Sequence, residues 1–296
     1  MLSILLKLIL NVFLFIVAGF IFSLIIGKRE KIIKFFINFA IFFVIPVFIF
    51  INMWTTKIDF VIAGKITVLA IVVLTSGAGL AVVFSKIMKT KYSRTCLPIF
   101  LMNSRYLAVP VNGLLLGPEG VAYAVVYDVV MTLYSATVGV SLVLGHTRGL
   151  DPYSLPMIIS SVLGFILNLT TNASAPEFIY IIGKYMSMIV LPLMLFFVGY
   201  RISMVTKDTW KQASLATLFR VGGGLAVGYL MVLLLNLTGP ARGVGIITSI
   251  MPSAVASYIF SEIYHADEKY AAATVSLSTL LSMIYIPLIA WLFNVR

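Results

Sequence analysis

Charged residues are scarce in this chain. Only 10% of its 296 residues are Asp, Glu, Lys or Arg, whereas 61% are hydrophobic and the mean hydropathy is +1.10. A soluble domain of ordinary composition carries about 25% charged residues. Polar side chains are therefore too few to cover a water-facing surface, which excludes a soluble globular domain and indicates a protein whose main solvent is lipid.

Cysteine, histidine and acidic residues are also few. The single cysteine, Cys96, excludes an intrachain disulfide, and the two histidines, His146 and His265, are too far apart in sequence to suggest a pair of metal ligands. Enzymes embedded in membranes need acids, histidines or metal ligands that converge at depth. The composition therefore argues against an enzyme, and we expect neither a metal nor a cofactor.

Nucleotide-binding motifs are missing from the sequence as well. The run Gly222-Gly223-Gly224 lacks the strand, the Lys and the Ser/Thr of a phosphate-binding loop, so close helix packing explains it better. We therefore do not expect ATP to drive this chain. Its net charge of +11 arises from basic residues in short loops, which topology and anionic lipid headgroups explain, so no nucleic-acid partner is expected.

Long apolar runs dominate what is present. A membrane-spanning helix needs about 20 mostly apolar residues, and ten such runs follow one another with short linkers. The predicted spans are 2–26, 35–54, 61–87, 95–116, 118–144, 153–170, 177–203, 211–237, 241–265 and 267–293. The predicted fold class is all-α and polytopic, with no appended soluble domain.

Basic residues are distributed unevenly between the two sides of this arrangement. Thirteen fall on one side, including Lys89 and Lys211, and six on the other, including Lys57. Because cytoplasmic loops are enriched in Lys and Arg, the first side is predicted to be cytoplasmic and both termini to lie outside the cell membrane. The richer side also contains Lys28, Arg29, Lys31, Lys34, Arg148 and Arg201.

The two halves of the chain repeat a pair of prolines. A proline in the second span is followed by Pro110 after 64 residues, and a proline at a similar place in the seventh span is followed by Pro252 after 60. The matched spacing predicts two halves, 1–150 and 151–296, of five spans each. An odd number of spans inverts the second half, and inverted repeats are typical of secondary transporters whose substrate lies near the midplane.

The later proline of each pair stands among polar residues. The fourth span contains the run from Asn103 through Pro110 to Asn112, and the ninth contains Pro252 followed by Ser253. Proline lacks an amide donor and clashes with the preceding turn, so the helices are expected to break or kink there. The freed amides and helix ends could hold an anion at mid-depth. The alternative is a pair of structural kinks that face protein.

Several short motifs occur in order along nearly the whole chain. They are Asn103 to Pro110, Gly117-Pro118-Glu119-Gly120, Tyr127-Asp128 with Val138-Gly139-Val140, Leu191-Pro192 through Val198-Gly199, and Met251-Pro252-Ser253-Ala254 followed by Tyr264. Together they resemble the auxin efflux carrier family. The resemblance implies ten spans in a 5+5 inverted repeat like that of bile-acid symporters, with proline-broken helices 4 and 9 crossing. It also implies a scaffold of spans 1, 2, 6 and 7 and a moving transport unit of spans 3–5 and 8–10.

The family resemblance carries expectations about the substrate. Family members carry organic anions, including malate, malonate and auxin, and the resemblance places Asn103, Pro110 and Pro252 at the crossover. The chain departs from the family at Arg105, where a small residue is usual, and at Met131, where a polar residue is common. An asparagine common after the proline of the ninth span is also absent. The identity of the substrate therefore does not carry over.

Arginines within the predicted spans are the sharpest individual signals. Arg105 lies about ten residues into the fourth span, near mid-depth. A charge there costs at least about 2.5 kcal/mol, so it should face the interior and find a partner: a substrate carboxylate, Asp128 or vestibule water. Asp128, deep in the fifth span, is either a proton carrier or the structural partner of Arg105. Arg220, near the cytoplasmic end of the eighth span, is expected to snorkel to the surface.

These observations predict a secondary active transporter that moves a small organic anion, a carboxylate such as malate, malonate or an auxin-like acid, by alternating access. The alternative is a ligand-sensing membrane receptor that retains the fold without transport. Membrane lipids and a coupling proton or Na⁺ are the other expected partners, with a homodimer left open. The predicted substrate site comprises Asn103, Arg105, Pro110, Asn112, Pro252 and Ser253, with Asp128 for proton or ion coupling.

Overall fold

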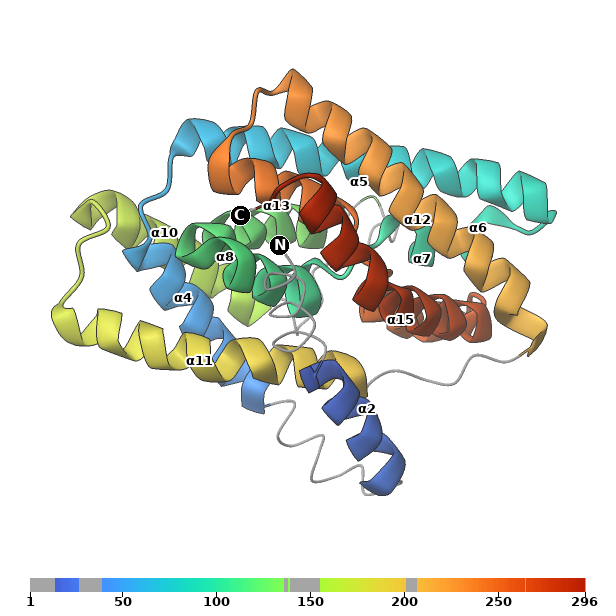
Figure 1. The fold of residues 1–296 in the computed structure, drawn as a ribbon, viewed down its shortest axis with the longest axis horizontal. Helices are drawn as coiled ribbons and strands as arrows, with labels where there is room; N and C mark the ends of the chain where they lie inside the picture. The colour runs from blue at the N-terminus through green and yellow to red at the C-terminus, as the bar shows by residue number, and fades with distance from the viewer. Residues whose placement is uncertain are drawn as a thin grey trace.

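The chain folds as an assembly of apolar helices. A computed structural model describes residues 14–26, 39–135, 138, 155–200, 207–263 and 265–295, which are helical apart from short linkers and one isolated bridge (Figure 1). The helices are α2 (Leu14–Ile26), α4 (Ile45–Thr55), α5 (Phe60–Met88), α6 (Tyr92–Thr95), α7 (Leu97–Phe100), α8 (Val109–Tyr134), α10 (Leu155–Thr171), α11 (Glu177–Tyr200), α12 (Lys207–Leu234), α13 (Gly239–Ser249), α14 (Val255–Ile263) and α15 (Glu268–Leu292). Two π-helical turns, η2 (Ala40–Val44) and η3 (Ser104–Ala108), precede α4 and α8.

Several of these helices have the length and composition of membrane spans. By length and composition, five stretches of the described residues could cross a bilayer: Phe60–Met88, Ser104–Tyr134, Glu177–Phe196, Thr209–Leu234 and Glu268–Leu292. The second of them turns back on itself at Gly117 and is not one straight span. Large apolar side chains are exposed along them, as lipid contact requires. The protein is therefore a helical membrane protein, and the total of ten spans stays a prediction.

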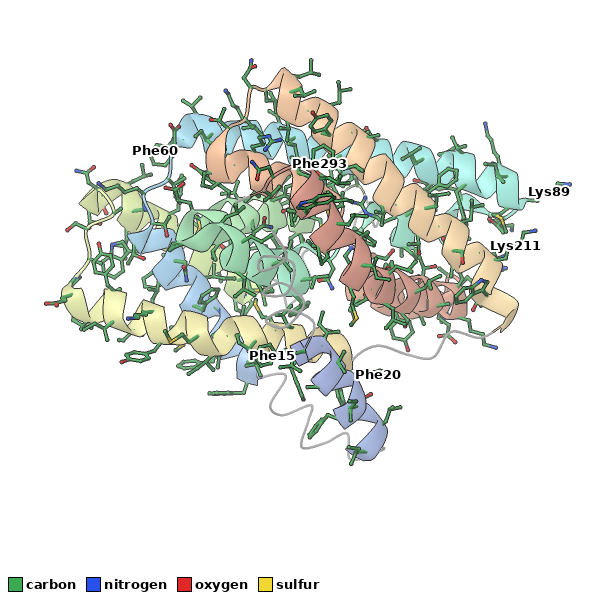
Figure 2. All side chains as sticks on the ribbon, viewed as in Figure 1. Phe15, Phe20, Phe60, Lys89, Lys211 and Phe293 are labelled. Carbon is green, nitrogen blue, oxygen red and sulfur yellow. The ribbon has the colours of Figure 1, made fainter. Side chains whose placement is uncertain are left out.

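Some predicted features lie outside the described residues. They are residues 2–13 of the first span, residues 139–144 of the fifth, Tyr264, His146, Lys28, Arg29, Lys31, Lys34, Arg148 and Arg201. Two described lysines from the richer basic side, Lys89 and Lys211, are exposed, and Figure 2 shows them at the same end of the molecule.

Four helices, α2, α4, α10 and α11, pack together as a first group (Figure 1). Helix α2 lies against α11, and α4 lies against α10 and α11. Glycines let the backbones touch, because a Cβ at Gly19 would fall on the carbonyl of Phe196 and one at Gly199 on the carbonyl of Ile16. Small residues that permit such close approach are typical of helix contacts in membranes.

A buried asparagine ties α10 to the end of α4 in this first group. The amide nitrogen of Asn168 donates to the carbonyls of Met53, Trp54 and Thr56 at 3.0, 3.0 and 2.6 Å. The last carbonyls of a helix have no partner within the helix. Asn168 supplies that partner and stabilises the end of α4.

The remaining helices, α5 to α8 and α12 to α15, form a second group. Helix α12 packs against α5, α13 and α15, while α8 packs against α5 and α13. The larger contacts between the two groups involve η3 and α8, which reach α4, α10 and α11. Any ligand that binds near η3 and α8 would therefore lie close to the boundary between the groups.

Helix α8 is two arms joined by a sharp turn. Gly117 has φ 68° and ψ −156°, which is not helical and which side chains other than that of glycine rarely allow. A Cβ at Gly120 would fall on the carbonyl of Asn112, so the arm after the turn runs back along the arm before it. The turn coincides with the boundary predicted between the spans at 95–116 and 118–144. It brings η3 beside the distal part of α8.

Candidate functional site

Two helices of the second group are interrupted within the protein interior. The first interruption, Leu101–Asn103, separates α7 from η3, and the second, Ile250–Ala254, separates α13 from α14. Every residue of both segments is buried. Backbone amides and carbonyls that leave a helix in such a place must find new partners.

The two interruptions supply those partners to each other. Met102 and Ser253 form an antiparallel bridge, with the amide of Asn103 donating to the carbonyl of Pro252 at 2.8 Å. The amide of Ala254 donates to the carbonyl of Leu101 at 2.9 Å. Main-chain hydrogen bonds thus hold together two segments that are about half the chain apart in sequence. We call this contact between Leu101–Asn103 and Ile250–Ala254 the junction.

Of the break or kink expected at Pro110, the structure has a distorted helical turn just before the proline and no break there, and the first break lies earlier, at Leu101–Asn103. Pro252 lies within its interruption, but Pro110 stands in the first turn of α8, well after Asn103. Proline is tolerated in the first turn of a helix because its missing amide has no partner there anyway. The preceding turn η3 is widened, with the amide of Val109 bonding to Ser104 five residues earlier, which accommodates the ring without an interruption.

Asn103 and Asn112 each bring one unused polar atom to this region. The side-chain oxygen of Asn103 accepts from the amide of Tyr106 at 3.2 Å, whereas its nitrogen is buried without a hydrogen-bond partner. The nitrogen of Asn112 donates to Thr248 of α13 at 3.1 Å, and its oxygen is likewise buried and unpartnered. One donor and one acceptor are therefore available to a ligand or to water.

Ser253 contributes its backbone and its hydroxyl to different partners. The hydroxyl donates to the carbonyl of Pro98 in α7, and the amide donates to the hydroxyl of Ser278 at 3.1 Å. Ser278 belongs to the polar face of α15 and also donates to the carbonyl of Thr274. Ser253 therefore connects the junction to α7 and α15. In this conformation its hydroxyl is already used in the hydrogen bond to Pro98.

Arg105 and Asp128 form an ion pair beside the junction. Nε of Arg105 lies 3.0 Å from Oδ2 of Asp128, and the guanidinium also donates to the hydroxyl of Thr132 at 2.7 Å. The other carboxylate oxygen accepts from Ser104. The side chains are 13% and 6% exposed, so the pair is largely shielded from solvent. Of the partners predicted for Arg105, Asp128 is the one it contacts in this conformation.

Arg220 does not snorkel, so that prediction is wrong. Its side chain is 1% exposed and lies in the interior, where it donates to the carbonyl of Ser249, to that of Met251 at 3.3 Å and to that of Ile99 at 3.5 Å. These carbonyls lie at the C-terminal end of α13, in the second interruption and near the end of α7. Arg220 therefore binds both interrupted helices at the junction.

The sequence around Arg220 contains a signal for its buried position. Gly224 and Gly228 follow it at helical spacing and make one small-residue face on α12. A Cβ at Gly224 would fall on the carbonyl of Ser249, and one at Gly228 would meet the Ser249 side chain. The face that carries Arg220 is therefore the face that packs against α13.

Comparison with known proteins points to membrane transport. A family model described as membrane transport protein matches residues 150–290. An uncharacterized transporter of Methanocaldococcus jannaschii is 27% identical over 217 residues, which cover 70% of this chain and 70% of that protein. Both matches are to transporters and not to enzymes.

Proposed function

We propose that the chain is a member of the auxin efflux carrier family of membrane transport proteins, and that it moves a small organic anion by alternating access, with the anion bound at the junction. The proposed substrate class is a carboxylate such as malate, malonate or an auxin-like acid. The observation that carries the proposal is the pairing of two buried helix interruptions at Asn103 and Pro252. Interrupted helices at mid-depth are the usual substrate sites of secondary transporters.

The unused polar atoms support an anion at this place. Nδ2 of Asn103 is a donor without a partner, and it lies at the start of η3, where helix amides also point. A carboxylate accepts hydrogen bonds from such donors and is favoured near helix N-termini. The unpaired oxygen of Asn112, further along α8, is an acceptor that suits a hydroxyl or a protonated acid group.

The division into two helix groups supports alternating access. In this proposal the first group stays fixed in the membrane, and the second group moves and carries the junction. The larger contacts between the groups involve η3 and α8, the elements that hold Asn103, Arg105 and Asp128. Movement of one group past the other would therefore expose these residues to each side of the membrane in turn.

Asp128 is the proposed site of proton coupling. A proton on its carboxylate would neutralise the charge that holds Arg105, and the released guanidinium could then bind a substrate carboxylate through two hydrogen bonds. The proton and the anion would in this way enter together. This scheme uses both predicted roles of Arg105, one in each protonation state.

Uptake by proteoliposomes tests the proposal. Purified protein should accumulate radiolabelled malate, malonate or indole-acetate above empty liposomes, and a pH gradient should change the rate. Asp128→Asn should remove the response to the gradient, whereas Ser135→Ala, about two turns further along, should retain it because that hydroxyl donates to the carbonyl of Thr132 in the same helix. Failure of every carboxylate with folded protein would overturn the proposal, and binding without counterflow would identify a sensor.

A further inference from the structure

The two arginines near the junction, Arg105 and Arg220, contact groups of different charge. Arg105 contacts a carboxylate, so it and Asp128 together are electrically neutral. The hydrogen bonds of Arg220 go to backbone carbonyls and to the sulfur of Met102, all of which are neutral groups. In the described part of the chain, no carboxylate lies within ion-pair distance of Arg220. Among the described residues, one full positive charge is therefore left without a counter-charge.

Helix ends at the junction do not supply that counter-charge. The C-terminal ends of α7 and α13 carry partial negative charge, while the N-terminal ends of η3 and α14 carry partial positive charge. Two ends of each sign meet at the same place, so their fields largely oppose each other. The charge of Arg220 remains as the net charge of the junction.

Buried hydroxyls lie near this cation. Those of Tyr127 in α8 and Tyr285 in α15 interact electrostatically with Arg220, and the Tyr127 hydroxyl also lies close to that of Ser249 in α13. Among the described residues, the neighbours of the cation are thus neutral polar groups and not acids. In a medium of low polarity a buried charge is costly unless it is paired.

We propose that Arg220 supplies the permanent positive charge that makes the junction selective for anions, so that the transported anion acts as its missing counter-ion. The inference rests on the proposed function and names the residue that sets its charge preference. The charge of Arg105 becomes available only when Asp128 is neutralised, whereas the charge of Arg220 is always present. A site with this field binds a dianion more tightly than a monoanion of the same shape.

The test measures charge preference rather than activity. Malonate and malonamate have nearly the same shape but differ by one negative charge, and their dissociation constants can be compared on purified protein in detergent. One unit charge at about 10 Å and an effective dielectric constant of about 20 changes affinity by roughly tenfold. Wild-type protein should bind malonate about tenfold more tightly, Arg220→Lys should keep this ratio, and Arg220→Gln should remove it.

Each result supports or overturns the inference. An unchanged ratio in Arg220→Gln would make the residue a purely structural clamp, because loss of packing weakens both ligands alike. If Arg220→Lys and Arg220→Gln lose the preference for malonate equally, the shape of the guanidinium matters and not its charge, which would overturn the inference. If Arg220→Gln does not fold, the wild-type protein still tests the inference. Equal dissociation constants for malonate and malonamate in the wild type would overturn it. Binding of neither ligand and no uptake would instead overturn the proposed function.

Discussion

At the scale of single residues, the membrane interior imposes one requirement that two arginines meet differently. A buried cation needs hydrogen-bond acceptors and, where available, an opposite charge. Arg105 of η3 meets the requirement with Asp128 and Thr132, which lie in the arm of α8 after the turn at Gly117. Arg220 meets it with carbonyls that two interrupted helices release. In the proposed function the first arrangement responds to a proton, whereas the charge of the second is permanent.

The ion pair predicts strong coupling between its two members. Arg105→Ala should lower the free energy of unfolding by about 3 kcal/mol, because the Asp128 charge is left buried without its partner. Asp128→Asn alone should also lower the free energy of unfolding, because it leaves the guanidinium of Arg105 without its carboxylate partner. The double variant Arg105→Ala/Asp128→Asn should recover much of the loss, as measured by chemical unfolding in detergent. Strictly additive losses would contradict a direct ion pair.

At the scale of elements, the glycines of α12 set how closely α13 can approach. A Cβ on Gly224 would meet the backbone carbonyl of Ser249, which cannot rotate away as a side chain can, whereas a Cβ on Gly222 would meet open space. In the run Gly222-Gly223-Gly224, a side chain is therefore tolerated at Gly222 but not at Gly224, where α13 touches α12. The predicted close packing is confirmed at Gly224 and, against Leu80, at Gly223, but not at Gly222.

This difference predicts unequal effects of two matched substitutions. Gly224→Ala should lower stability by about 1–3 kcal/mol and reduce transport, because α13 is pushed away from Arg220. Gly222→Ala should be neutral or stabilising by up to about 1 kcal/mol through improved helix propensity. Melting temperatures in detergent and uptake rates check both. Equal effects of the two substitutions would show that α12 and α13 do not touch at Gly224.

The elements also show what the sequence could and could not predict. Apolar runs predicted the helical segments because lipid requires about 20 apolar residues per span. Proline predicted an interruption at Pro252 but misplaced the other, because Pro110 fits the first turn of α8. The pairing of Met102 with Ser253 has no sequence signal, since it depends on how two distant segments meet. The place of Arg220 along its span alone predicts snorkelling, but the small-residue face of Gly224 and Gly228 packs against α13 and turns the arginine inward.

At the scale of the whole molecule, α5 indicates how the protein sits in the bilayer. Its 29 residues span about 43 Å, close to the thickness of a bilayer with its headgroups. Lys57 precedes this helix, and Lys89 follows it. Lys211, at the start of α12, lies at the same end as Lys89 (Figure 2). The positive-inside rule assigns the end with Lys89 and Lys211 to the cytoplasm.

Site-directed labelling tests this orientation. In a Cys96→Ala background, single cysteines at Lys89 and Lys211 should react with a membrane-impermeant maleimide only from the cytoplasmic side. A cysteine at Lys57 should react only from outside. All three lysines are exposed, so accessibility does not limit the reaction. Labelling of Lys57 and Lys89 positions from one side would contradict α5 as a span.

The central claim is that two interrupted helices meet to hold an anion within the membrane. A density map of the protein with a bound carboxylate tests it most directly. The account predicts ligand density at the junction, within hydrogen-bond distance of Nδ2 of Asn103 and between the segments 101–103 and 250–254. Ligand density elsewhere, for example between α4 and α11 with the junction unchanged, would contradict it.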